Sequence, residues 1–406
     1  MIKVGIIGGG PAGIIAALEV AKIGGEIILF DLNPRLGKKL SVTGSGRCNI
    51  TNLNAAPKFY TSSSQEVLQS IFQVTQPINF IEYLRNLGIL TYHSSDGWVY
   101  PVSNSASNVV DIFLEHLKNR KVDIHVNEKI HTISSGENGF VLTSSTGKMY
   151  AVNKVIIASG GKAHEELGAN DDILNSVALL GHRLIPFRPA LAPVLLQQPI
   201  NKGLKGVRLD VNASLYKNEQ IIAQTSGNII FTEWGINGPA VMDLSHLIQE
   251  PKLTRYKLQL DFLHNFTGDF KNCFSRASCK EMHVVTLLKS MLPEKLILFM
   301  FNKYPALLDA RIGNLFQSQI EFLLENLTAF ELRVSGTRDF NFSQLSAGGI
   351  NLKDINEYSL ESKIIPGLFF AGEALDVNGP CGGFNLQWAF GSGFAAGSAV
   401  LGKYLP

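Results

Sequence analysis

The start of the chain combines short apolar runs with glycines. Val4–Ile7 is a continuous apolar run, which is typical of a parallel strand buried on both faces. The residues after Gly13 have the apolar spacing of a helix, and Ile27–Phe30 forms a second short apolar run. This order predicts a strand, a helix and a second strand in one βαβ unit, which indicates an α/β fold.

The rest of the first half predicts more short elements. Residues 65–87 have helical spacing that is interrupted at Pro77, and Val109–Leu117 predicts another helix. Short runs separated by turn residues predict a meander and then a second core strand: Val122–Val126, His131–Ser134, Phe140–Ser144, Met149–Val152 and, in the core, Val155–Ala158. Residues 33–52 have no sustained apolar period, so we expect a ligand-binding loop there.

The second half changes pattern twice before it returns to the first. Alternating strands are expected from Pro186 to about Leu260, and helical spacing dominates residues 281–330. A strand at Leu368–Ala371 and a helix at Phe384–Leu401 then complete the first domain. We therefore expect a first domain of residues 1–188 plus 345–406, a β-rich middle domain of 189–275 plus 331–344, and a helical insert of 276–330.

Composition limits the class of protein. The 406 residues are 45% hydrophobic and 17% charged, with a net charge of +2, so we expect a well-packed globular protein. The absence of a leader and of a run of transmembrane length predicts a cytoplasmic protein without a membrane partner. The four cysteines, Cys48, Cys273, Cys279 and Cys381, are spaced irregularly, which predicts no disulfide framework and no metal site. A redox centre would then have to be a bound cofactor.

The first glycine turn has the spacing of a dinucleotide site. Gly8, Gly10 and Gly13 form GxGxxG, in which they permit the tight turn, the approach of a pyrophosphate and the close packing of helix on strand. The helix that follows presents unpaired N–H groups and a positive dipole end to an anion. Asp31 ends the second strand near the spacing of about 20 residues at which a carboxylate meets a ribose.

A second glycine-rich segment, GLFFAGEALDVNGPCGGFNLQWAFGSGFAAG, repeats this order close to the C-terminus. Two such segments far apart in the chain indicate one large ligand, and they favour FAD over NAD, because FAD enzymes commonly bring a distant segment to the ribityl chain and flavin. Gly372 and Glu373 are then placed for the ribityl chain, and residues 382–385 open a helix toward the flavin. Asp31 is assigned to the adenosine ribose of FAD. A glycine-rich turn between packed elements is the alternative.

The strings GGGPAG, NPRLGKKLSVTGSGRCNITN, FTEWGINGPAVMDLS, SAGGINLKDIN and AGEALDVNGPCGGFNLQWAFGSGFAAG resemble those of the BaiN/YhiN-type NAD(P)/FAD-dependent oxidoreductases over nearly the whole chain. The resemblance implies a split, glutathione-reductase-like Rossmann domain that binds FAD, a β-barrel-like middle domain and a small helical insert. It implies a small or RNA-tethered unsaturated substrate, since branches of the family act on steroid-type enones, an amino-ketone or a uridine in ribosomal RNA.

The motif match implies a set of residues around the FAD, to which the turn after the second core strand adds Gly160: Gly8, Gly10, Pro11, Ala12, Gly13, Asp31, Lys39, Gly44, Gly46, Arg47, Cys48, Asn49, Gly160, Gly372, Glu373, Gly383, Phe384, Asn385 and Leu386. The chain departs from the family in two places. Asp31 stands where a glutamate is usual, and ASGG followed by KAHEELGANDD replaces ATGG and a serine-rich turn.

The sequence leaves the proton donor open. Cys48 is a candidate because Arg47 beside it would lower the pKa of its thiol, and the alternative is a small buried residue packed on the cofactor. Arg47 itself would orient a substrate carbonyl or counter the FAD pyrophosphate. The run of Tyr92, His93, Trp98 and Tyr100 is a candidate lining of a substrate pocket, and Glu233, Trp234 and Asn237 a candidate cover for the flavin.

These observations favour an FAD-dependent reduction of an activated C=C bond, enone-like or uracil-like. No second strand and glycine turn is present for NAD(P)H, so NAD(P)H is expected as a transient electron donor. The alternatives are an oxidase of an amine or aminoketone that uses O₂, an RNA-associated flavoprotein, and a flavin-binding protein without turnover. The RNA alternative requires a basic face from Lys202, Lys205, Arg208, Lys217, Lys252, Arg255 and Lys257.

Overall fold

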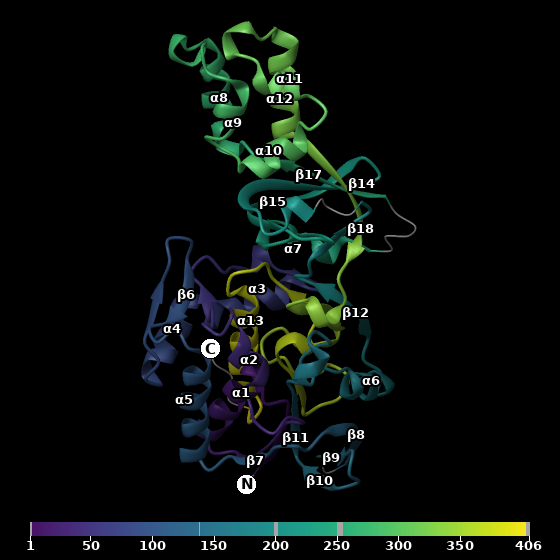
Figure 1. The fold of residues 1–406 in the computed structure, drawn as a ribbon. Helices are drawn as coiled ribbons and strands as arrows, with labels where there is room; N and C mark the ends of the chain where they lie inside the picture. The colour runs from purple at the N-terminus through teal and green to yellow at the C-terminus, as the bar shows by residue number, and fades with distance from the viewer. Residues whose placement is uncertain (1, 138, 199–201, 250–254, 403–406) are drawn as a thin grey trace. The chain divides into compact units, whose positions relative to one another are not determined.

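The computed structural model describes residues 2–137, 139–198, 202–249 and 255–402 (Figure 1). The chain divides into two units: unit 1 is Met1–Arg188 with Gln344–Pro406, and unit 2 is Pro189–Ser343. None of the described helices is long and apolar enough to cross a bilayer. Each unit is described by itself below.

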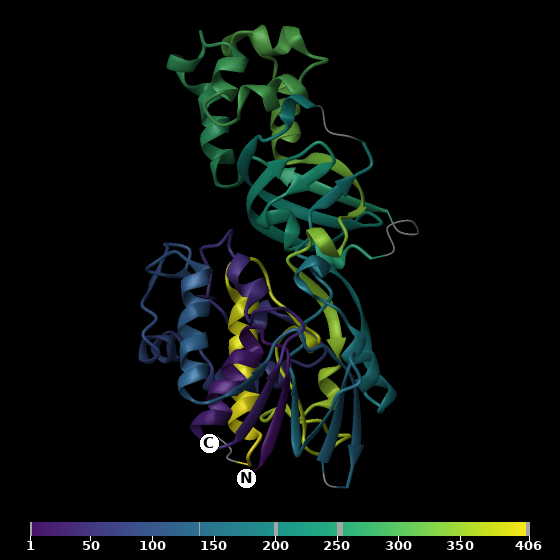
Figure 2. The same cartoon turned by 60° about the horizontal axis from the view of Figure 1, so that its bottom comes forward.

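A five-stranded parallel sheet forms the centre of unit 1 (Figure 2). Its order is β20 (Leu368–Phe370), β11 (Lys154–Ile157), β1 (Lys3–Ile7), β2 (Glu26–Phe30) and β7 (Asp123–His125). The apolar runs that predict β1, β2 and β11 are almost wholly buried, as expected for strands covered on both faces. The strand expected near the C-terminus is present as β20, and it pairs with β11 at the sheet edge.

Helix α13 (Phe384–Ala399) packs closely against helix α1 (Pro11–Lys22), and the two lie side by side in both views (Figures 1 and 2). A Cβ on Gly393 would lie 2.3 Å from the carbonyl oxygen of Ala12, and one on Gly397 would lie 2.6 Å from that of Ala16. The glycines of α13 therefore permit the close contact between the two helices. Because 393 meets 12 and 397 meets 16, the two helices run in the same direction.

The remaining elements of unit 1 surround this core. They are α2 (Lys38–Val42), β3 (Thr51–Asn52), β4 (Thr61–Ser62), α3 (Gln65–Val74), α4 (Pro77–Asn86), β5 (Thr91–His93), β6 (Trp98–Pro101), α5 (Ala106–Asn119), β8 (Ile130–Gly136), β9 (Gly139–Ser144), β10 (Met149–Val152), α6 (Asp172–Leu179), β12 (Leu184–Ala190), β19 (Leu345–Ile350) and β21 (Val377–Asn378). The expected helices on either side of Pro77 are present as α3 and α4. The expected loop 33–52 contains the short elements α2 and β3.

One predicted strand belongs to a different sheet. The sequence predicts Val122–Val126 as the first strand of the meander, and this is wrong. The strand β7 pairs in parallel with β2 in the central sheet, and the meander consists of β8, β9 and β10. Helix α5, which precedes β7, supplies the crossover that returns the chain in the direction of β2.

Unit 2 contains a closed six-stranded barrel. Its order is β13 (Val194–Leu196), β16 (Gly235–Asn237), β15 (Gln220–Phe231), β14 (Arg208–Lys217), β17 (Tyr256–Asp261) and β18 (Phe330–Thr337), with α7 (Pro239–Met242) after β16. Alternate side chains of β14 and β17 are buried, as expected for a barrel filled by its own side chains.

A group of helices separates β17 from β18 along the chain: α8 (Thr267–Ser275), α9 (Val284–Leu288), α10 (Glu294–Met300), α11 (Pro305–Asp309) and α12 (Gln317–Thr328). The insert was expected to begin at residue 276, but helix α8 lies before that residue. The strands on either side of these helices are paired with each other in the barrel. The helices are therefore inserted between two neighbouring strands without interrupting the barrel.

The α1–α13 contact predicts a stability effect. Replacing Gly393 with alanine places a methyl group against a backbone oxygen, which no side-chain rotation relieves, so the helices must separate. We expect G393A to lose about 2 kcal/mol of unfolding free energy in urea titrations followed by circular dichroism. The matched control is G136A, since a Cβ on Gly136 meets no atom within 4 Å. Equal stability of G393A and G136A would contradict this account of the contact.

Candidate functional site

The glycine turn after β1 meets two different requirements. Gly8 has φ of 107°, and a Cβ there would lie 2.3 Å from the carbonyl oxygen of Ala158; one on Gly13 would lie 1.8 Å from that of Gly8. These two glycines are required by the fold itself. Gly10, the N-cap of α1, has no protein atom within 4 Å of its Cβ position. Gly10 therefore leaves open space at the N-terminus of α1, where a bound phosphate is favoured.

Asp31 is fixed beside this turn. One carboxylate oxygen accepts the N–H of Gly9 at 2.8 Å, and the other accepts the N–H of Asn33 at 2.7 Å. Burial raises the pKa of Asp31 above its ordinary value, and the two backbone hydrogen bonds act in the opposite direction. The end of β2 is thereby tied to the glycine turn.

The loop between α2 and β3 is held in a tight left-handed conformation. Gly44, Ser45, Gly46 and Cys48 have φ between 57° and 83°, and the N–H of Cys48 donates to the carbonyl oxygen of Thr43 at 3.0 Å. No protein atom lies within 4 Å of the Cβ position of Gly46. The loop therefore leaves open space beside its own backbone, as the turn at Gly10 does.

The residues after this loop pack against the start of α13. A Cβ on Gly383 would lie 2.3 Å from the carbonyl oxygen of Thr51, and the side-chain amide of Asn52 donates to the carbonyl oxygen of Gly382 at 2.9 Å. When the side-chain oxygen of Asn49 faces α13, it accepts the N–H of Gly383 at 3.2 Å. Two segments that are more than 300 residues apart in the sequence thus form one surface.

The first residues of α13 are fixed by neighbouring groups. Asn385 closes the turn before the helix, because its side chain accepts the N–H of Gly379 and donates to the carbonyl oxygen of the same residue, both at 2.8 Å. The hydroxyl of Tyr60 donates to the carbonyl oxygen of Phe384 at 2.7 Å. The N–H groups of the first helical turn have no partner within a helix, so this end of α13 favours negative charge.

Gly372 and Glu373 join the same surface from the end of β20. The N–H of Gly372 donates to the hydroxyl oxygen of Ser392 at 2.8 Å, which fixes it against α13. Glu373 forms an ion pair with Lys39 at 2.9 Å and accepts the N–H of Ser346 at 2.7 Å. The structure thus brings Lys39 and Glu373 together. Ser346 opens the string SAGGINLKDIN, which carries part of the family resemblance, but it is not among the expected site residues.

The turn after β11 contains an unsatisfied hydroxyl. The Oγ of Ser159 is buried and has no hydrogen-bond partner among the described residues. A Cβ on Gly8 would lie 2.9 Å from the Cα of Ser159, and the Cβ position of Gly160 has no protein atom within 4 Å. A buried hydroxyl without a partner is unusual in a folded protein, and here it lies beside open backbone. The turn therefore fits a ligand that supplies the missing partner.

The parallel direction of α1 and α13 sets a distance along this surface. Gly393 meets the first turn of α1, while α13 begins nine residues earlier, at Phe384. Ala12 is the second residue of α1, so the start of α13 precedes the start of α1 by eight residues, an axial offset of about 12 Å at about 1.5 Å per residue. The surface thus presents two positive helix ends that are offset along its length, which fits the pyrophosphate and the flavin of one FAD.

The expected lowering of the Cys48 pKa is wrong. Cys48 is fully buried, and burial raises the pKa of its thiol to about 12. The Arg47 guanidinium is held by other groups: it lies 4.4 Å from the ring centroid of Tyr100 and donates to Tyr92 and Asn104. The alternative, a small buried residue, fits the structure.

Other candidates have structural partners. Lys205 pairs with Glu233, Lys257 pairs with two glutamates, and Arg338 lies over the ring of Trp234. Lys252 and the side chain of Lys202 lie outside the described residues. Two lysines of the expected basic face, Lys205 and Lys257, are therefore paired with glutamates. Arg208, Lys217 and Arg255 of the same expected face are exposed.

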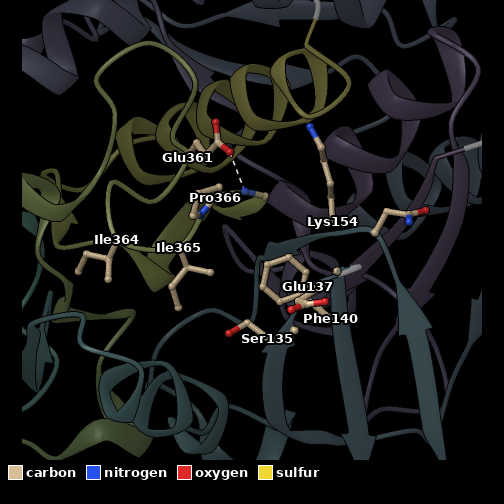
Figure 3. A pocket seen from close by; sticks show the side chains of 12 residues that line it. Ser135, Glu137, Phe140, Lys154, Glu361, Ile364, Ile365 and Pro366 are labelled. Atoms are coloured by element: carbon tan, nitrogen blue, oxygen red, sulfur yellow. Dashed lines mark hydrogen bonds between the residues drawn. The ribbon is translucent and has the colours of Figure 1, made fainter.

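Unit 1 also contains a cavity of about 720 Å³ at the opposite end of the sheet (Figure 3). It lies beside Lys154, at the start of β11, and beside Gly367, just before β20; Glu361 accepts the N–H of Gly367 at 2.7 Å. Ligands of open parallel sheets bind at the carboxyl ends of the strands, so this cavity is not part of the candidate site. Among the described residues, no group of three His, Cys, Asp or Glu side chains could hold a metal ion.

The burial of Cys48 predicts its reactivity. At pH 8 a thiol with a pKa of about 12 is ionised in about one molecule in ten thousand. We expect iodoacetamide to alkylate the half-buried Cys279 in the native protein and to reach Cys48 only after unfolding in guanidinium. Peptide mass spectrometry measures both sites in one sample. Native alkylation of Cys48 as fast as that of Cys279 would contradict this assignment.

The chain is similar to known proteins over nearly its whole length. The family described as HI0933-like protein Rossmann domain matches residues 2–399. The 3-dehydro-bile acid delta(4,6)-reductase of Clostridium scindens is 30% identical over 413 residues, covering 98% of this chain and 99% of that protein. The ribosomal RNA dihydrouridine synthase of Escherichia coli is 27% identical over 401 residues, covering 98% and 97%.

A solved structure shares the fold. The 3-ketosteroid-delta4-(5alpha)-dehydrogenase from Rhodococcus jostii RHA1 superposes with a TM-score of 0.52 at 14% identity, covering 98% of this chain and 97% of that one. The split Rossmann fold expected from the sequence is confirmed. The chain belongs to the HI0933-like family and is an FAD-dependent oxidoreductase.

Proposed function

We propose that this protein uses FAD, reduced by NAD(P)H, to saturate a C=C bond that is conjugated to a carbonyl group. The observation that carries the proposal is the parallel packing of α1 and α13, with two helix N-termini offset by about 12 Å along their common axis. A bound FAD supplies hydride transfer. The residues of this surface bind the cofactor, orient it and stabilise its charge.

Each end of the cofactor has its own group of residues in this proposal. The turn at Gly8–Gly13 and Asp31 hold the pyrophosphate and the adenosine ribose, and Lys39 with Glu373 holds the ribityl chain. The first turn of α13 faces the flavin and favours negative charge on it, which raises its reduction potential. Apart from Arg47, the rest of the expected set is assigned to the same cofactor in this proposal: Gly44, Gly46, Cys48, Asn49, Gly160, Gly372, Gly383, Phe384, Asn385 and Leu386.

The names of two relatives support the choice of reaction. One is named as a bile acid delta(4,6)-reductase and the other as a dihydrouridine synthase, and both names describe the saturation of a C=C bond. Each relative spans nearly the whole chain, so the comparison includes unit 2 as well as the cofactor surface. NAD(P)H is the proposed electron donor because a reductase needs one at each turnover.

Replacement of Gly10 tests the cofactor site. A methyl group on Gly10 meets no protein atom, so G10A should fold normally while its methyl contacts the pyrophosphate. We expect FAD affinity to fall about 5- to 150-fold, measured by titrating apoprotein with FAD and following flavin fluorescence. G136A is the matched control, and G8A should instead disturb the fold, because its methyl meets backbone. Unchanged FAD affinity in G10A would rule out this placement of the pyrophosphate.

The reaction itself is tested by flavin absorbance. We expect anaerobic NADH or NADPH to bleach the yellow protein, and a conjugated enone such as cyclohexenone to restore the oxidised spectrum with formation of the saturated ketone. Peroxide formed from an amine substrate and O₂, without NAD(P)H, would instead identify an oxidase. A protein that NAD(P)H does not reduce would contradict the proposed electron donor.

A further inference from the structure

The hairpin of β5 and β6 has an apolar surface on its solvent side. Tyr92 is paired with Tyr100, and the N–H of Val102 donates to the carbonyl oxygen of Leu90, so these four alternate residues share one face. Leu90 is 61% exposed, Val102 is 59% exposed and Tyr92 is 39% exposed. Tyr100, on the same face, is 8% exposed. On the opposite face Val99 and Pro101 are buried and His93 is exposed.

This pattern is the reverse of what folding requires. A hairpin with one buried face ordinarily carries polar residues on the other, because exposed apolar side chains add nothing to the core. Three exposed apolar side chains side by side form a contiguous patch, and such patches on protein surfaces mark binding sites. We call Leu90, Tyr92, Tyr100 and Val102 the hairpin platform.

Arg47 is a fixed cation on the hairpin platform. Its guanidinium lies 4.4 Å from the ring centroid of Tyr100, and it donates through Nε to Asn104 and through Nη2 to Tyr92, both at 3.3 Å. The Tyr92 hydroxyl in turn donates to Asn104 at 2.7 Å. Among the described residues, Arg47 has no carboxylate partner and its Nη1 has no hydrogen bond. The guanidinium is oriented and retains free donors.

The hairpin platform continues toward the flavin end of the cofactor surface. Trp98 precedes Tyr100 by two residues and shares its face of β6, and a Cβ on Gly382 would lie 2.9 Å from the indole nitrogen of Trp98. Arg47 is also two residues before Asn49, which contacts the N–H of Gly383. The apolar patch and the start of α13 are therefore neighbours within unit 1.

We propose that the hairpin platform binds the substrate, a flat and largely apolar enone, and that Arg47 donates a hydrogen bond to its carbonyl oxygen. This inference rests on the proposed function. The double bond gains a hydride at its β carbon and a proton from water at its α carbon, while the reduced flavin is oxidised. Negative charge collects on the carbonyl oxygen between the two steps, and the cation of Arg47 stabilises it there.

The composition of the platform favours this substrate class over a nucleic acid. A polynucleotide carries a phosphate at each residue and requires several cations, whereas this face has a single arginine among apolar side chains. An apolar ring system covers Leu90 and Val102 and places one polar atom at Arg47. In this assignment Arg47 binds the substrate and does not contact the FAD phosphates.

The test uses the FAD-loaded protein and two enones of different size, cyclohexenone and 4-androstene-3,17-dione. We expect R47Q to keep its FAD and its rate of reduction by NAD(P)H, and to lose about 100-fold in kcat for both enones. Y92F, which removes one hydroxyl that holds Arg47, should lose less. R120Q is the matched control, because Arg120 is exposed and bonds within α5.

A second variant separates the apolar patch from the arginine. L90S/V102S changes two exposed side chains, so folding should be unaffected. We expect equilibrium dialysis to show about tenfold weaker binding of the steroid, with binding and turnover of cyclohexenone unchanged. Dialysis needs no turnover, so this arm tests the platform even if the proposed reaction fails.

Three outcomes would overturn the inference. Loss of FAD from R47Q would assign Arg47 to the cofactor. Equal steroid binding by L90S/V102S and wild type would show that the hairpin platform does not bind the substrate. Binding of an oligouridylate that both variants abolish, without steroid binding by the wild type, would replace the substrate class by RNA. Steroid binding that depends on the platform, without reduction of either enone, would support the binding surface and contradict the proposed function.

Discussion

The close contact between α1 and α13 determines most of the geometry of unit 1. The helices come from opposite ends of the chain, and they approach so closely because Gly393 and Gly397 present no side chain to the backbone of α1. Their register fixes how far the start of α13 extends beyond the start of α1. A large side chain at either glycine would move one helix terminus relative to the other, so the contact controls the site as well as the fold.

The two carboxylates of the candidate cofactor surface are each held by groups of the protein itself. Asp31 accepts two backbone N–H groups, and Glu373 accepts the N–H of Ser346 while it pairs with Lys39. Side chains that are already fixed lose little conformational freedom on binding, which leaves more of the contact free energy for affinity. The same principle applies to Arg47, which Tyr92 and Asn104 hold in one orientation.

The sequence predicts the elements whose pattern is local. β1, α1 and β2 have continuous apolar runs, and the glycine spacing marks their junctions. The place of β7 is not local, because its three residues, Asp123–His125, are partly exposed and have no strong period. The helix before it was the available signal, since a strand, a helix crossover and a strand return the chain in parallel. At Cys48 the error has another cause: adjacent residues in a left-handed turn direct their side chains differently, so Arg47 lies beside Tyr100 while the thiol is buried.

The helices between β17 and β18 show why a large insertion is tolerated in unit 2. β17 and β18 are paired from Tyr256 with Val334 to Leu260 with Phe330, so the insertion begins and ends at neighbouring points of the barrel. The inserted helices share one hydrophobic cluster with the barrel strands, which includes Leu296 and Leu323 of the helices and Leu258 of the barrel. Loss of the buried side chains of α10 would therefore weaken the barrel too, because neither part has a core of its own. The insertion enlarges the surface of unit 2 while the ladder of hydrogen bonds around the barrel stays closed.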